Sequence, residues 1–309
     1  MMIPDFAALC LMLYVTIDDH YRALPPDLKP RGEQAMCSDS ELLTMLVVGE
    51  CMGWHRETEH VSQWARHRDL FPHPPDRTRL NRRRRALSTT VTALRCRVLA
   101  ALDLALDRQC VVDSLPVPVM GYPLVPGANN AGQWRSWGAD VGGIASKKQH
   151  LFGYRLHLLV TLGGVILDYV LAPASAHDVA VAPELLDGHD DLVVVGDKGY
   201  LSAPFAATLH QEQAVDLLTP PRRNALHPPP PGRVSLWNGL RHTAQGAPVE
   251  TVNAQLTEQF EIGQHGAHTF GGLAARLETK LTAHTLGIAL NWQLGKAAWL
   301  QIKALAFPI

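Results

Sequence analysis

The chain has 309 residues, of which 47% are hydrophobic and 18% are charged, and its formal net charge is -1. This composition is that of a globular protein and excludes an intrinsically disordered chain, and the length suits one small and one large domain. The apolar run from Phe6 to Val15 is too short to cross a bilayer and lacks a basic leader, so we expect a buried helix. Five cysteines without a Cys-x-x-Cys pair indicate a reducing compartment and argue against a zinc site or a disulfide framework.

Residues 1–108 are predicted to form a helical domain. Ser38 and Glu41 form a capping box that opens one helix, and further helices are predicted over 57–66 and 77–106. The last of these carries a dense arginine cluster, which favours phosphate contacts, although a solvated helix face has the same composition. We expect a helix-turn-helix-like DNA-binding domain, while any small helical bundle would show the same pattern. The expected DNA contacts here are Arg77, Arg79, Arg82, Arg83, Arg84 and Arg85.

The hydrophobic pattern changes after Cys110 to that of buried strands. Strands are predicted at 111–116, where Pro116 and Pro118 are expected to end the pairing, and at 192–195. Asp113 lies within the first strand and Asp197 follows the second. A carboxylate beside so apolar a run costs several kcal/mol to desolvate unless it is hydrogen-bonded or bound to a cation. The alternative for Asp197 is a cap on the next turn.

The remaining elements alternate between strands, helices and loops. An irregular excursion carrying Lys147 and Lys148, which are expected to contact DNA, is predicted over 121–150, and a hairpin over 151–171 follows it. Downstream we expect helices over 174–187 and 203–213, a strand over 215–218, a proline-rich extended loop over 220–233, and helices from 248 and 273 onward.

The last two helices carry further candidates. Glu250 flanks an apolar stripe on the helix that begins at Pro248, where a dipole-favoured surface glutamate is the alternative. Arg276 and Lys280 belong to a polar row that either reaches DNA phosphate or faces solvent. Asp113, Asp197 and Glu250 can converge only if the two strands are neighbours and the helix packs across them, as in an RNase H-like mixed sheet. Oxygen ligands of this kind favour two Mg²⁺ or Mn²⁺ ions over zinc.

Several segments in this order match one family. They are SDSELLTMLVVGE (38–50), NRRRRAL (81–87), VVDSLPVPV (111–119), KKQHLFGYRLHLLVTLGG (147–164), LAPASAHD (171–178), VVVGDKGY (193–200) and VETVNAQL (249–256). Together they resemble the DDE transposases of bacterial insertion sequences, and the resemblance covers nearly the whole chain.

The resemblance implies a catalytic RNase H-like domain over 109–309 behind the helical DNA-binding domain. Asp113, Asp197 and Glu250 would be the metal-binding catalytic triad, and Lys198 would contact phosphate. The expected activity is Mg²⁺-dependent cut-and-paste transposition on double-stranded DNA, at terminal inverted repeats and target sites. A homodimer on paired DNA ends, a cytoplasmic location at the bacterial nucleoid and no membrane association are also expected.

One departure from the family leaves alternatives open. Where members usually carry basic residues before the helix glutamate, this chain has Gln245-Gly246-Ala247-Pro248, and the nearest arginine is Arg241. A catalytically impaired relic that only binds specific DNA is therefore the main alternative. A nuclease of the same fold that cuts without joining is the second.

Overall fold

The computed structural model describes residues 3, 5–31, 36–101, 107–122, 130–144, 149–220, 236–237, 239–240, 248–296 and 299–302. The chain divides into two compact units, of which residues 105–253 form the sheet unit. Residues 1–104 and 254–309 together form the helical unit, whereas the predicted division placed the C-terminal segment with the sheet. No helix among the described residues is both long and apolar enough to cross a membrane. Lys147, Lys148, the proline-rich loop beyond Pro220 and the segment before Pro248 lie outside the described residues.

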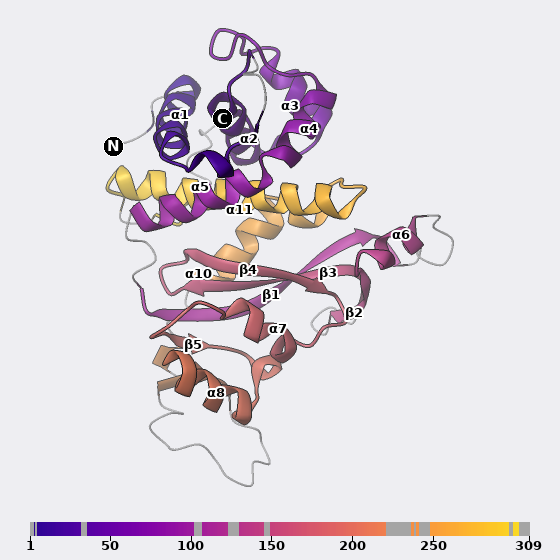
Figure 1. Ribbon diagram of the computed structural model, residues 1–309, viewed down its shortest axis with the longest axis vertical. Coiled ribbons are helices and arrows are strands. Elements are labelled where there is room, and N and C mark those ends of the chain that lie inside the picture. The colour runs from indigo at the N-terminus through magenta and orange to yellow at the C-terminus, as the bar shows by residue number, and fades with distance from the viewer. Residues whose placement is uncertain are drawn as a thin grey trace. The chain divides into compact units, whose positions relative to one another are not determined.

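The sheet unit is built on a six-stranded mixed sheet with β1 near its middle (Figure 1). The strands are β1 (Gln109–Met120), β2 (Asp140–Ile144), β3 (Gln149–Thr161), β4 (Ile166–Pro173), β5 (Val193–Val195) and β6 (Asp216–Leu218). β3 pairs antiparallel with β1 along one edge and with β2 and β4 along the other, while β1, β5 and β6 are parallel. The order β4-β3-β1-β5-β6 confirms the predicted RNase H-like sheet.

Two helices pack against one face of this sheet. α7 (Asp178–Leu185) and α8 (Ala203–Gln213) share an apolar core with the strands, and α6 (Ala131–Ser136) precedes β2. Val112 of β1 belongs to this core. Because side chains alternate along a strand, Ser114 points to the same face as Val112, and Asp113 points to the opposite face.

The prediction that Pro116 and Pro118 end the pairing of β1 is wrong. The strand continues through Pro116 and Pro118, which pair with β3 at Arg155 and Gly153. Prolines two residues apart direct their nitrogens to one edge, and pairing of β1 with β5 ends at Val111, so no ladder hydrogen bond is lost there.

Residues 121–150, which were predicted to be irregular, also contain α6 and β2. Part of the glycine content of this segment belongs to strand β2. A Cβ at Gly142 of β2 would lie 1.9 Å from the carbonyl oxygen of Ala174, the residue that follows β4. A composition that is typical of a loop therefore reflects the close approach of two backbones.

The helical unit contains six longer helices among the described residues. They are α1 (Phe6–Arg22), α2 (Asp39–Cys51), α3 (Glu57–Trp64), α4 (Arg77–Ala86), α5 (Ser88–Ala101) and α11 (Phe270–Gln293). The capping box of Ser38 and Glu41 is confirmed at the start of α2. The single helix predicted over 77–106 is wrong: α4 ends at Ala86 and α5 begins at Ser88, where a run of serine and threonine favours a new helix start.

A buried ion pair joins α2 to α11 within the helical unit. The Nζ of Lys280 lies 2.6 Å from Oε2 of Glu50 and also donates to the Phe260 carbonyl, and Nδ1 of His55 is 2.7 Å from the same carboxylate oxygen. Glu50 and Lys280 are 5% and 2% exposed. Burial alone would raise the pKa of Glu50, but Lys280 and His55 outweigh it and hold that pKa at about 2. The Glu50 carboxylate is therefore charged throughout the neutral pH range, whereas burial lowers the pKa of Lys280 and Glu50 opposes that shift.

Three residues that the sequence offered as DNA contacts are paired or buried within the helical unit. Lys280 is paired with Glu50, Arg276 is paired with Glu57, and Arg84 is only 6% exposed. Their charges face the interior because α11 packs with the N-terminal helices, a long-range contact that the local polar pattern does not encode. Arg83 is also engaged, by Asp39 at 2.6 Å and by the Cys37 carbonyl. The exposed arginines of α4 are Arg77, Arg79, Arg82 and Arg85.

We expect Lys280→Met to lower the free energy of unfolding by about 3 to 5 kcal/mol, because the Glu50 carboxylate would remain buried without its cation. Urea unfolding followed by circular dichroism measures the change. The control is Lys296→Met, at a lysine beyond the end of α11, where we expect a change below about 0.5 kcal/mol. Equal unfolding midpoints for the two variants would contradict a stabilising role for the pair.

Candidate active site at the strand ends

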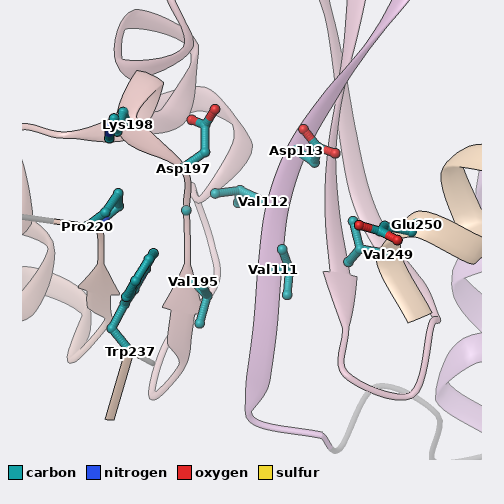
Figure 2. Close-up of a pocket in the computed structure, with 11 residues that line it drawn as sticks. Val111, Val112, Asp113, Val195, Asp197, Lys198, Pro220, Trp237, Val249 and Glu250 are labelled. Carbon is teal, nitrogen blue, oxygen red and sulfur yellow. The ribbon is translucent and has the colours of Figure 1, made fainter. Parts of the chain in front are cut away.

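One pocket of the sheet unit contains all three predicted catalytic acids. Its volume is about 360 Å³, and its lining includes Asp113, Asp197 and Glu250 (Figure 2). Figure 2 shows Pro220 and Trp237 on the side of the pocket away from α10 (Pro248–Ala254), the helix that carries Glu250. Acids from two strands and one helix, far apart in the sequence, thus face one cavity.

The register of the sheet places the two aspartates side by side. Val111 of β1 is the parallel partner of Val195 of β5, and Asp113 and Asp197 each lie two residues farther on. Both aspartates therefore lie at the end where the pairing of β1 with β5 stops, Asp113 within β1 and Asp197 just after β5. Oδ1 of Asp197 accepts a hydrogen bond from the Gly199 backbone at 2.7 Å, which is the capping role that the sequence offered as the alternative.

The environment of Asp113 disfavours its charged form. Desolvation raises the pKa of Asp113 above its ordinary value, and the charges of Asp197 and Asp178 raise it further. Two donors act in the opposite direction: the Ser114 backbone bonds Oδ1 at 2.8 Å, and Nδ2 of Asn253 bonds Oδ2 at 2.6 Å. A half-buried carboxylate held near like charges is the environment that a cation would relieve.

Sequence reasoning missed Asn253, although its spacing could have identified it. Asn253 lies three residues after Glu250 on α10, and residues three apart on a helix share a face. Its amide spans 140 residues of sequence to reach Asp113, so it fixes α10 beside β1. Its Oδ1 atom is buried and has no hydrogen-bond partner among the described residues.

Glu250 and Lys198 line the pocket but are less constrained. Both are exposed, and Glu250 lies in the first turn of α10. No group of three His, Cys, Asp or Glu side chains within the described part of the chain is close enough to hold one metal ion. The structure therefore brings Asp113 and Asp197 together and leaves Glu250 at the wall of the same pocket.

The donor set fits a hard divalent cation. Carboxylate oxygens from Asp113 and Asp197, with Glu250 and the amide oxygen of Asn253 nearby, are the ligands that Mg²⁺ and Mn²⁺ prefer. The described pocket lining contains no cysteine or histidine, which are the usual zinc ligands. A cation here would also compensate the like charges that raise the pKa of Asp113.

Comparison with known proteins agrees with this geometry. A family model described as "Transposase DDE domain" matches residues 105–286, which is more than half of the chain and includes the whole sheet unit. No curated protein and no solved structure is significantly similar to the chain.

We expect Asn253→Ala to raise the pKa of Asp113 further in the metal-free protein, because the hydrogen bond from the amide favours the charged carboxylate. A carboxyl-carbon NMR titration of Asp113 measures the change. Asn81→Ala is the matched control, since the Asn81 amide bonds Glu57 in the helical unit. A pKa of Asp113 that stays the same in Asn253→Ala would show that this hydrogen bond does not tune the site.

Proposed function

The chain belongs to the transposases with a DDE domain, and we propose that it cuts DNA at the ends of an insertion sequence and joins those ends to target DNA. The observation that carries this proposal is that Asp113 and Asp197 each lie two residues beyond the paired Val111 and Val195 and line one pocket with Glu250. Hydrolysis at the element terminus frees a 3′-hydroxyl, which then attacks a target phosphodiester. Both steps are in-line displacements at phosphorus, so one site serves both.

We assign the metal ligands to Asp113, Asp197 and Glu250. When bound, two Mg²⁺ ions, or Mn²⁺ in their place, would lower the pKa of the attacking water or hydroxyl. They would also neutralise charge on the leaving oxygen. Asn253 orients Asp113, and exposed Lys198 at the pocket lining contacts a DNA phosphate. Glu250 at the pocket lining would complete the set, since a cation would offset the repulsion among three carboxylates.

We propose that the exposed face of α4 binds the DNA backbone. Arg79, Arg82 and Arg85 follow one another at intervals of three residues, which places them on one side of the helix. They are exposed, unlike Arg84. Two DNA ends must be cut and joined together, which favours a homodimer on DNA.

The relic is the competing proposal, and the sequence before Glu250 favours it. The four residues from Gln245 to Pro248 supply no cation for phosphate positioning. Such a protein would bind the element ends tightly without cutting them. A nuclease of the same fold would cut them and form no joined product.

We expect Asp113→Asn and Asp197→Asn each to abolish Mg²⁺-dependent cleavage of the gene's own flanking DNA and to leave DNA binding within about twofold. The amides keep the shape but lose the charge that holds a cation. Nicked and joined products on a sequencing gel measure activity, and a gel shift measures binding. Asp187→Asn, at an exposed aspartate, is the control and should cut at the parental rate.

A parental protein that binds these ends but never cuts them would support the relic, and nicks without joined products would support the nuclease. Cleavage at the parental rate by Asp113→Asn or Asp197→Asn would contradict the assignment of these aspartates as metal ligands.

Replacing Arg82 and Arg85 with alanine is expected to weaken binding to all DNA sequences alike. Each lost phosphate contact should reduce the slope of log K against log salt by about 0.9, because one fewer counterion is released. Fluorescence anisotropy over a salt series measures the slope, and Arg22→Ala on α1 is the control. An unchanged slope in the double variant would place the DNA contact on another surface.

A further inference from the structure

We infer that Asp178 is a positioning residue, which ties the segment after Asp113 to the turn after Asp197 and so sets the separation of the two metal-binding aspartates. This inference rests on the proposed function. Asp178 is the first residue of α7, and it contacts Ser114, whose side chain points to the face of the sheet opposite to that of Asp113.

The contacts of Asp178 reach both sides of the site. Its Oδ1 accepts a hydrogen bond from the Ser114 hydroxyl at 3.3 Å, across 64 residues of sequence, and Ser114 follows Asp113 directly. The guanidinium of Arg155 and the imidazole of His157, both on β3, lie 3.8 and 3.7 Å from the same oxygen. One carboxylate oxygen therefore contacts β1 and β3 together.

The other oxygen of Asp178 packs against the turn that follows Asp197. A Cβ built on Gly199 would lie 2.2 Å from Oδ2 of Asp178 and 3.0 Å from Oδ1 of Asp197. The two carboxylates thus meet at one backbone position. Gly199 lacks a side chain where those oxygens lie, and this explains the glycine between Lys198 and Tyr200.

A simple helix-capping role does not account for this carboxylate. The N-cap of α7 is His177, and no side chain makes a capping hydrogen bond there. The sequence alone would make Asp178 a cap of its own helix. Instead its carboxylate bonds across the sheet to Ser114, with a side chain that is only 17% exposed.

Buried neighbours fix the network in place. His157 is fully buried, and its Nδ1 is 3.3 Å from the hydroxyl of Tyr200, which is 1% exposed and follows Gly199. The contacts of Asp178 thus continue through His157 and Tyr200 to the turn that follows Asp197.

The test compares Asp178→Asn with the exposed control Glu184→Gln on the same helix. Cleavage of the terminal DNA is measured over a Mg²⁺ titration, with unfolding midpoints and DNA affinity recorded for every variant. Asp178→Asn keeps an acceptor for Ser114 but loses the charge that faces Arg155. We expect the Mg²⁺ midpoint to rise by about 10- to 100-fold, as when an outer-shell partner of a metal ligand is lost, with near-parental cleavage at saturating Mg²⁺.

Gly199→Ala supplies a second variant that removes no charge. Its methyl group would displace the Asp178 carboxylate, the end of a short side chain, so the fold should survive while the spacing changes. We expect the same shift of the Mg²⁺ midpoint. Gly132→Ala is the control, because a Cβ there meets nothing within 4 Å.

Two outcomes would overturn the inference. An Asp178→Asn midpoint equal to that of Glu184→Gln would show that Asp178 does not position the site. Loss of cleavage at every Mg²⁺ concentration would make Asp178 a direct ligand instead. Both are read against Asp113→Asn: if that variant cuts at the parental rate, the proposed function fails, whatever Asp178 does.

Discussion

The parallel pairing of β1 with β5 is the constraint on which the rest of the site depends. Once Val111 is opposite Val195, Asp113 and Asp197 each lie two residues beyond this last pair, at the same end of the β1–β5 pairing. Their like charges and the desolvation of Asp113 then oppose ionisation, and the pKa of Asp113 rises. The fold therefore concentrates an electrostatic cost at one point, which is typical of sites where a cation binds.

Features with local signals could be predicted from the sequence. The hairpin, α8 and the capping box of α2 depend on hydrophobic alternation, helix propensity and two residues three apart, and the structure contains all of them. The apolar runs before Gly196 and around Val112 likewise placed Asp113 within a strand and Asp197 just after one. Signals of this kind need no knowledge of the tertiary fold.

The partners of the acids were not predicted, because the contacts join residues that are distant in sequence. The amide of Asn253 and the carboxylate of Asp178 reach β1 across 140 and 64 residues, and only Asn253, three residues after Glu250 on one helix, has a local signal. The arginines of α4 show the same limit. Arg82 and Arg84 point to opposite sides of one helix, so one is exposed and the other is buried, yet composition treats them alike.

The hydrogen bonds around Asp113 reconcile a tuned carboxylate with metal binding. Each oxygen of Asp113 accepts one bond, from the Ser114 backbone or from Asn253, and each carboxylate oxygen has two acceptor positions. The donors thus fix the orientation of the group while leaving capacity for a cation at both oxygens. Because these donors also lower the pKa, they keep the carboxylate available against the desolvation that raises it. The backbone bond from Gly199 to Oδ1 of Asp197 orients the second acid in the same way, so both are aligned before a cation arrives.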